Sequence, residues 1–588
     1  MGKKVVPYKG QKYDEIVKRC QASGSPWEDP EFPASDASLF NKRSSPGRIE
    51  WKRPKDICPN PHLVVEGTST GDVSQGQLGN CWFVASCANL AQEKELWETV
   101  VPNYKEQEWD DEHPEKYCGV FHFRFWRFNQ WLDVVIDDRL PTNNNKLIYV
   151  HSKERNEFWS ALLEKAYAKL SGCYENLDGG NTADALVDFT GGVAETISLT
   201  DEKYMEDFEK KKEFHKSLKK YSERNFLMSA SIKFVLYHHV MFGPWSDGSP
   251  EWNKVSDSQR KSLGITFDDD GEFWMPFDDF CTQFTNLVIC RMPNKSYFSI
   301  QRTWHEKVMI SAWKKGQGKA NRAGGCINNR ETFLQNPQFI ISVDSDEDDI
   351  ILCLTQPDHK AENKENKTIG FNLMKVEDNR KYRLHTPGQK VLNSTFINSR
   401  SVFEKCTLKR GRYVVLATTF DAGEEGPLMM RIFSDEGAKC WELVKEAPSR
   451  TMMSNIRGYP QVVSKITVLS ATGLQKQDHF GGGADPYVYL RWDNHTTRSP
   501  VIKNSLNPEF NFSAILYRKK PQNPIVVEIW NSNVVKDQFM GAAVFMAPVD
   551  NQPKQYTSPL HGKGRKTDET RPGSISVVVH TTNDLEAF

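Results

Sequence analysis

The sequence predicts an α+β fold in its amino-terminal half, followed by two all-β sandwiches. Three observations carry this prediction. A glycine-rich loop leads into a helix that begins at Cys81, amphipathic helices alternate with a hairpin up to about residue 230, and short β-type runs fill the chain from about residue 295. The length of 588 residues suggests several domains, and 38% hydrophobic residues are enough to bury their cores.

The loop before Cys81 has the residues expected around a catalytic cysteine nucleophile. Residues 75–83 read Gln-Gly-Gln-Leu-Gly-Asn-Cys-Trp-Phe, so Asn80 is placed as an N-cap and Cys81 falls in the first helical turn. A helix N-terminus favours thiolate over thiol. Gln75 is placed to donate an amide hydrogen bond to an oxyanion beside Cys81. A buried structural cysteine is the alternative, but the combination of features favours a nucleophile.

Composition excludes several classes of protein. The net charge of -1 gives no sign of a nucleic-acid partner. The chain has no apolar run of transmembrane length and no signal peptide, and Val6 stands where myristoylation needs Ser or Thr. The 12 cysteines form no CxxC pair, which indicates reduced thiols. Reduced thiols favour a cytosolic or nuclear compartment. We expect a cytoplasmic protein, with membrane association as an open alternative.

Helices and a hairpin make up the rest of the amino-terminal half. A short helix is expected around residues 13–19, and the Cys81 helix is expected to run to about residue 100. Residues 121–128 and 131–136 alternate as a hairpin around Asn129 and Gln130. A helix over 157–170 carries an apolar stripe, and a lysine-rich helix spans 201–224, with a solvated face favoured over contact with anionic lipid.

The β-type runs begin near residue 295. Strands are predicted at 338–343, 350–354 and 412–419. The acidic residues between the first two strands lack EF-hand spacing and are expected to form a solvated turn. Residues 447–460, rich in Pro, Ser and Met, read as a linker, and residues 461–588 are again rich in β runs.

The loop at 75–82 resembles the papain-like active-site loop of the calpains, the intracellular calcium-dependent cysteine proteases. Other stretches are similar to calpains as well, and they cover nearly the whole chain: 135–142, 157–169, 188–192, 245–247, 270–275 and 323–326. Residues 473–478, 484–490 and 507–511 resemble the first calcium loop, the following strand and a strand entry of a C2 domain. A terminal C2 module in place of paired EF-hands is similar to the calpain-5 branch.

The resemblance implies an α+β papain-like two-lobed catalytic core, with the second lobe incomplete, followed by a calpain β-sandwich and a C2 domain. The boundaries that we expect are a leader at 1–25, lobe one at 26–195, a truncated lobe two at 196–293, the calpain-type sandwich at 294–446, a linker at 447–460 and the C2 domain at 461–588.

The second lobe lacks the partners that a catalytic cysteine needs. Calpains carry a base in a Gly-His-Ala context and an orienting Asn in an Asn-Pro-Trp context, and neither motif occurs here. Only ten residues, 233–242, stand where the family has several strands, as in a splice product or a gene-model error. His238 and His239 are the remaining candidate bases, without the family context. We expect a proteolytically inactive or nearly inactive chain.

The resemblance also implies Ca²⁺ as cofactor, with one ion in each lobe. Calcium prefers six to eight oxygen ligands. The first site maps onto the carbonyls of Val65 and Gly67 and the carboxylates of Asp72 and Glu175. The second site is partial, because a further glutamate falls near the altered Val240, and its remaining residues are Asp247, Asp270 and Glu272.

The carboxy-terminal module keeps only part of a C2 calcium site. Asp478 and Asp485 fit the first loop and Asp537 the second, but Asn531 and Asn533 stand where aspartates are expected. Fewer charges weaken calcium binding. Calcium-independent binding of lipid or protein is therefore the favoured interpretation, with an anionic membrane surface as a candidate partner.

Two functions follow from the sequence. The first is a calcium-dependent cysteine endopeptidase that makes limited cuts in protein substrates, with Cys81 as nucleophile and activity lost or strongly impaired. The second is a catalytically silent calpain-like scaffold or membrane adaptor that binds other proteins through its sandwich and C2 domains.

Overall fold

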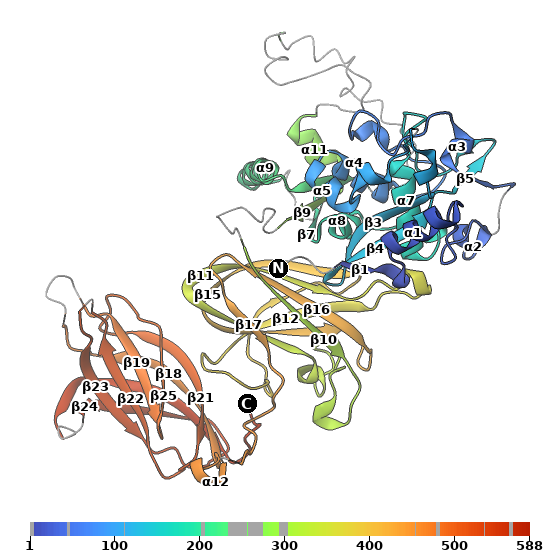
Figure 1. Cartoon of the computed structure of the whole chain (residues 1–588). Coiled ribbons are helices and arrows are strands. Elements are labelled where there is room, and N and C mark those ends of the chain that lie inside the picture. Colours follow the sequence, from blue (N-terminus) through green and yellow to red (C-terminus); the bar gives the residue numbers. More distant parts are fainter. Residues whose placement is uncertain are drawn as a thin grey trace. The chain divides into compact units, whose positions relative to one another are not determined.

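The computed structural model describes residues 5–43, 47–110, 112–200, 206–232, 256, 275–292, 304–452, 454–477, 483–533, 535–563 and 568–588. The chain forms two compact units (Figure 1). The first comprises residues 1–301 together with 357–366, and the second comprises residues 302–356 and 367–588.

The first unit is α+β. Three small sheets have the strand orders β1-β4-β3, β2-β5-β6 and β7-β9-β8. The strands are β1 (Val5–Pro7), β2 (Glu50–Lys52), β3 (Val120–Arg127), β4 (Gln130–Asp137), β5 (Leu140–Asn143), β6 (Lys146–Leu147), β7 (Val193–Ser198), β8 (Leu227–Ser231) and β9 (Asn286–Arg291). The helices are α1 (Tyr13–Ser23), α2 (Asp36–Leu39), α3 (Pro54–Ile57), α4 (Cys81–Ala91), α5 (Lys94–Val100), α6 (Tyr104–Gln107), α7 (Trp159–Ser171), α8 (Thr182–Thr190), α9 (Phe208–Glu223) and α11 (Phe277–Gln283).

The helix α7 is buried on every side, not only along its apolar stripe. Its aromatic residue Tyr167 packs against Phe83 of α4 and Phe125 of β3, with ring centroids 4.9 and 5.3 Å apart. Polar residues of α7 are therefore buried too, and each needs a partner inside the unit. The expected helix from Cys81 to residue 100 is in fact two helices, α4 and α5, broken at Gln92 and Glu93.

The hairpin of β3 and β4 is confirmed, but its turn is shifted by one residue. Trp126 pairs with Trp131, and the turn residues are Phe128 and Asn129, with φ angles of 44° and 67°. Two positive φ angles match the right-handed twist of the strands, and Asn accepts this conformation readily. The sequence placed the turn at Asn129 and Gln130, because Phe128 is an unusual residue at positive φ.

The second unit contains two antiparallel β modules. The first module consists of β10 (His305–Trp313), β11 (Gln338–Thr355), β12 (Thr368–Val376), β13 (Gln389–Asn393), β14 (Ile397–Asn398), β15 (Ser401–Thr419), β16 (Gly426–Ser434) and β17 (Lys439–Glu442). The second consists of β18 (Val462–Thr472), β19 (Pro486–Trp492), β20 (His495–Arg498), β21 (Glu509–Arg518), β22 (Ile525–Asn531), β23 (Gln538–Phe545), β24 (Lys554–His561) and β25 (Thr570–Thr582). The helix α12 (Ser454–Arg457) lies in the stretch that reads as a linker.

The acidic segment of β11 is not the turn that the sequence predicts. One strand runs from Gln338 to Thr355, and its register against β15 shifts between Val343 and Glu347. Glu347 pairs with Lys409 across the strands, and Arg410 contacts Asp346 at 3.2 Å. Opposite charges on the neighbouring strand stabilise an acidic strand, and a bulge accommodates the change of register.

Candidate active site

Cys81 is the first residue of α4 and is exposed to solvent. The carbonyl of Asn80 accepts the first hydrogen bonds of the helix, from the N–H groups of Phe83 at 2.8 Å and Val84 at 3.1 Å. Within the described part of the chain, the Cys81 thiol has no hydrogen-bond partner. The predicted helix start is therefore confirmed, with an accessible thiol at the positive end of the helix.

The loop before Cys81 depends on close backbone packing. A Cβ atom at Gly76 would lie 2.5 Å from the carbonyl oxygen of Ile148, so only glycine fits there. The next residue, Gln77, donates its N–H to the same carbonyl at 2.9 Å. Gln75 donates its side-chain amide to the carbonyl of Leu78 at 2.7 Å, inside the loop. Its role as oxyanion donor stays a prediction.

Asn80 does not cap α4 with its side chain, contrary to the prediction. Its amide Nδ2 donates instead to Oε1 of Glu164 in α7 at 2.6 Å. The other oxygen of Glu164 accepts the N–H of Val150 at 2.9 Å. Burial raises the pKa of Glu164 to about 8, because these two hydrogen bonds only partly offset the cost of a buried charge. The buried carboxyl therefore fixes the residue before Cys81.

Sequence reasoning missed Glu164. The apolar stripe predicts a helix with one buried face, and a glutamate outside that stripe is expected to face solvent. The one signal was the length of the run 157–170, in which apolar and small residues surround Glu164 on both sides.

Trp82, the residue after Cys81, is held by the loop that precedes α8. Its indole Nε1 donates to the carbonyl of Leu177 at 3.1 Å, and the backbone of Gly180 lies against the face of the ring. Gly179, which lies between Leu177 and Gly180 in the same loop, donates its N–H to the carbonyl of Gly79 at 3.0 Å. Residues on both sides of Cys81 are thus fixed by one loop.

The carboxylates of the predicted first calcium site already accept hydrogen bonds. Asp72 is buried and accepts from Ser69 (N–H at 2.9 Å, hydroxyl at 2.6 Å) and from the indole of Trp159 at 3.1 Å. Glu175 accepts three backbone N–H groups in a row, at 2.6, 2.9 and 3.2 Å, from Asn41, Lys42 and Arg43. Partial burial alone would raise the pKa of Glu175, but these bonds outweigh it and lower the pKa.

The carbonyl-bearing loop of that site is anchored as well. Glu157 accepts the N–H of Val65 at 2.8 Å and the hydroxyl of Ser152 at 2.7 Å, and burial raises its pKa to about 7. Gly67 has a φ of 99°, which only glycine adopts without strain. In the described ranges, no group of three or more His, Cys, Asp or Glu side chains is placed to hold a metal. A site here would thus rely on carbonyls in addition to Asp72 and Glu175.

Six predicted site residues lie outside the described residues: His238, His239, Asp247, Asp270, Glu272 and Asp478. The remaining C2 residues bond to their own loops and to neighbouring segments of the module. Asp537 accepts the N–H of Asn533 at 3.0 Å and the hydroxyl of Tyr487 at 2.7 Å, and both bonds lower its pKa. Asp485 accepts the N–H of Asn504 at 2.8 Å, and its own N–H donates to the amide oxygen of Asn531 at 2.6 Å.

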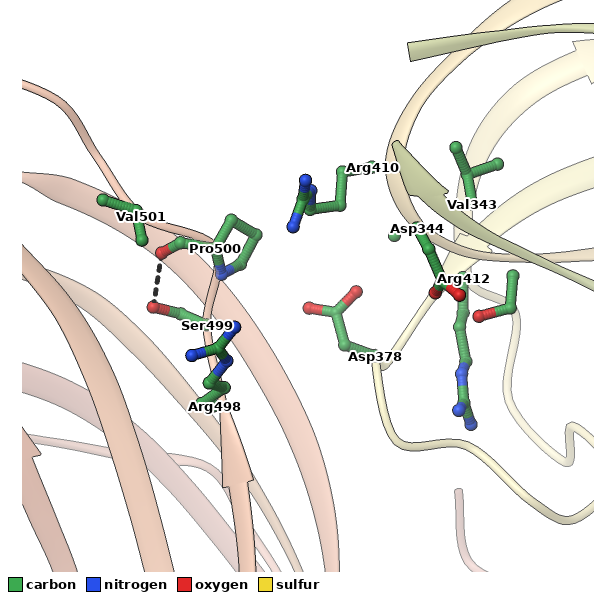
Figure 2. A pocket seen from close by; sticks show the side chains of 11 residues that line it. Val343, Asp344, Asp378, Arg410, Arg412, Arg498, Ser499, Pro500 and Val501 are labelled. Carbon is green, nitrogen blue, oxygen red and sulfur yellow. Dashed lines mark hydrogen bonds between the residues drawn. The ribbon is translucent and has the colours of Figure 1, made fainter. Parts of the chain in front are cut away.

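A hollow of about 310 Å³ lies in the second unit (Figure 2). It carries charges of both signs, with the carboxylate of Asp378 pointing into the space bounded by Arg410 and Arg498. Burial raises the pKa of Asp378. None of the residues predicted for catalysis or calcium binding lines this hollow.

Comparison with known proteins places these features in a family. The model of the calpain family cysteine protease matches residues 27–241 and 238–291, that of calpain large subunit domain III matches 309–433, and that of the C2 domain matches 463–560. Calpain-5 of Mus musculus is 42% identical over 635 residues, which cover 99% of this chain and 99% of that protein. The chain belongs to the calpain family.

Other calpains match too. Calpain-5 of Caenorhabditis elegans is 35% identical over 645 residues, covering 98% of both chains, and Calpain-A of Drosophila melanogaster is 39% identical over 493 residues, covering 72% of this chain and 57% of that protein. A solved structure of a C2 domain from plant Extended Synaptotagmin 1 covers 21% of this chain and 95% of its own, with 26% identity and a TM-score of 0.19.

This calpain thus has a protease core, a domain III β-sandwich and a C2 domain, as predicted. Its alignment with the mouse relative is longer than its own 588 residues, so that relative has residues without a counterpart here. The two matches to the protease model meet at residues 238–241. In the described part of the chain, no helix is long and apolar enough to cross a membrane.

Proposed function

We propose that this calpain keeps the nucleophile of a calcium-dependent cysteine endopeptidase but has lost most of its peptide-cleaving activity. One observation carries the proposal. An accessible Cys81 begins α4, whereas the chain contains neither a Gly-His-Ala nor an Asn-Pro-Trp motif. The chain thus carries the cysteine that would act as nucleophile, but it lacks the two motifs that hold the activating residues in the family.

The chemistry of thiol proteases explains the expected loss. An ordinary cysteine has a pKa of about 8.5, so only a few per cent of it is thiolate at neutral pH. A helix N-terminus increases that fraction, but it does not protonate the leaving amine. Removing one member of a catalytic triad lowers turnover by several orders of magnitude. His238 and His239 are the residues left to act as an improvised base.

The first lobe offers the types of ligand atom that calcium binds. Val65 and Gly67 would supply carbonyl oxygens and Asp72 and Glu175 carboxylates, which are the ligands that calcium prefers. A bound ion would supply positive charge that holds these segments together. Three backbone N–H groups donate to Oε2 of Glu175, so an ion that binds this oxygen competes with three hydrogen bonds. For the second lobe we propose a partial site at Asp247, Asp270 and Glu272.

The test uses the full chain with and without calcium. A thiol-directed peptidyl epoxide should label Cys81, and calcium should produce no casein cleavage above that of Cys81→Ser. Calcium-stimulated cleavage that disappears in Cys81→Ser would overturn the proposed loss of activity. In that case His238→Ala and His239→Ala, made separately, show which histidine serves as the base.

A second function is supported by the C2 loops. Asn531 and Asn533 are amides where calcium-binding C2 domains carry aspartates, and the carboxylate of Asp537 accepts hydrogen bonds from its own loop and from Tyr487 of β19. We propose that the modules at 294–446 and 461–588 act as a scaffold or membrane adaptor, with binding proteins or an anionic lipid surface as partners. If the inactive variant Cys81→Ser still binds such partners, this result supports the role.

A further inference from the structure

Residues 357–366 follow β11 and precede β12 in the sequence, yet they belong to the first compact unit. They contain one helical turn, η8 (Lys360–Glu362), which is started by a hydrogen bond from the N–H of Lys360 to Asp358 at 2.9 Å. Three sets of contacts join this segment to the elements around Cys81.

The first contact is a partly buried ion pair between Asp358 and Arg127 at the end of β3. The same guanidinium contacts Asp188 of α8 at 2.8 Å and the hydroxyl of Tyr167 at 3.3 Å. Tyr167 packs edge-on against Trp82, with ring centroids 6.0 Å apart. Asp358 therefore joins a charged cluster that borders the aromatic group behind Cys81.

The second set fixes the backbone of the segment. Asn176 donates its side-chain amide to the carbonyl of Lys360 at 3.1 Å and to Asn363 at 3.3 Å. Asn363 donates in turn to the side chain of Asn41 at 3.2 Å. At Gly172, after α7, a Cβ atom would lie 3.0 Å from the Cα of Ala361, so the two backbones pack directly.

The third contact reaches the cysteine loop itself. The ammonium of Lys360 lies 5.2 Å from the ring centroid of Trp82 and donates to the carbonyl of Gly179 at 3.3 Å. Trp82 directly follows Cys81, and the N–H of Gly179 holds the carbonyl of Gly79, two residues before Cys81. One side chain thus contacts the supports on both sides of the nucleophile.

We propose that residues 357–366 form a brace for the active-site loop, in which Asp358 and Lys360 are positioning residues for Cys81. The brace holds Trp82 and the loop at Gly179, and these hold the start of α4. The helix N-terminus favours the thiolate only while the first turn is ordered, so the brace sets the reactivity of Cys81. The consequence for catalysis rests on the proposed role of Cys81 as nucleophile.

The segment offers a matched control. Lys364 lies four residues after Lys360, is exposed, and pairs with Glu362 of the same segment at 2.7 Å. Lys364→Ala therefore removes the same charge from the same stretch without touching Trp82 or Gly179. Lys360→Arg restores a cation of similar reach over the indole ring.

The experiment is site-resolved alkylation of the full chain by iodoacetamide between pH 6 and 9, read by mass spectrometry at every cysteine. In Lys360→Ala and Asp358→Ala, Cys81 should react about two- to fivefold more slowly at neutral pH, which is the size of the effect of a helix N-terminus on an anion. The midpoint of its pH profile should rise. Lys364→Ala should match the wild type, and Lys360→Arg should recover most of the rate.

Two results would overturn the brace. Either Cys81 keeps its rate and pH profile in both variants, or buried cysteines such as Cys87 and Cys173 become reactive together with any change at Cys81, which would indicate general destabilisation. Alkylation needs no peptide turnover, so a chain without proteolysis still gives a decisive answer. Conversely, a wild-type Cys81 that reacts only as fast as a free thiol counts against the proposed nucleophile.

Discussion

Glu164 of α7 accepts the side-chain amide of Asn80 at 2.6 Å, and this bond fixes the residue before Cys81. The start of α4 is thus set from a neighbouring buried helix and not by a cap of its own. A buried carboxyl with a pKa raised to about 8 is protonated over most of the neutral range. The geometry around the nucleophile is therefore coupled to a titration inside the core.

We predict that Glu164→Gln flattens the pH dependence of stability. Glu164 has a pKa of about 8 in the folded chain and an ordinary value near 4.5 when unfolded. Between these values the folded state binds more protons, so the free energy of unfolding falls as pH rises from about 4.5 to 8. Glutamine keeps an acceptor and removes the titration. Between pH 4.5 and 8, the free energy of unfolding should therefore fall by on the order of a few kcal/mol more in the wild type than in Glu164→Gln. Urea unfolding curves measure this difference.

The comparison is made as a difference from the wild type, so other titrating groups such as Glu157 cancel. Glu98→Gln, at an exposed position of α5, serves as control and should leave the pH dependence unchanged. Wild-type and Glu164→Gln curves that run parallel from pH 5 to 8.5 would contradict the buried titration.

Much of the fold could be predicted from local patterns. The start of α4 falls at Cys81, where the glycine-rich loop places it, although the predicted cap by Asn80 is absent. The hairpin of β3 and β4 and the helix α7 follow from alternation and helical spacing. The acidic segment of β11 could not be predicted as a strand, because Lys409 and Arg410 of β15, which lie beside Glu347 and Asp346, are distant in the sequence. That pairing joins residues more than sixty positions apart, and periodicity contains no information on it.

The candidate site divides in the same way. Cys81 could be predicted because its loop and helix are contiguous in sequence. The contacts of Asn80 with Glu164, and of Trp82 with Lys360, could not be predicted, because they come from α7 and from a segment almost three hundred residues away. Asn80 shows the physical reason. Its side chain could cap the helix, but it donates instead to a buried carboxyl that needs a hydrogen-bond donor.

We predict that Lys165→Met strongly destabilises the first unit. The ammonium of Lys165 is buried in α7 and contacts the carboxylate of Asp137, while its N–H groups donate to the carbonyls of Asp137 at 2.9 Å and Arg139 at 2.6 Å. Burial would raise the pKa of Asp137, but Lys165 and Arg139 outweigh it and lower the pKa to about 2. Removing the cation leaves a buried charge, which costs about 3–5 kcal/mol.

Urea unfolding followed by tryptophan fluorescence measures this loss. Lys12→Met is the control, because the pair of Lys12 with Glu15 is exposed and should contribute nothing measurable. Equal midpoints for Lys165→Met and the wild type would show that Arg139 alone satisfies Asp137.

We predict that calcium speeds hydrogen exchange at residues 41–43. The N–H groups of Asn41, Lys42 and Arg43 all donate to one oxygen of Glu175. A calcium ion that takes this same oxygen, Oε2, as ligand competes with the three bonds, and freed amides exchange faster. Exchange mass spectrometry of the full chain, with calcium or with a chelator, measures the change. Glu175→Gln should remove the calcium effect, and equal exchange at 41–43 with and without calcium would speak against Oε2 of Glu175 as a ligand.

We predict that vesicle binding by the full chain is nearly independent of calcium. Asp537 directs its carboxylate to Asn533 and Tyr487, and Asn533 adds no charge to the second loop. A calcium site with few carboxylates is weak, so the attraction to lipid must come from the protein itself. Pelleting with phosphatidylserine vesicles should change less than about twofold between chelator and about 1 mM calcium. Asn533→Asp adds one of the two missing charges at a half-buried position and should make binding calcium-dependent. Wild-type binding that a chelator abolishes would instead assign the C2 domain a working calcium site.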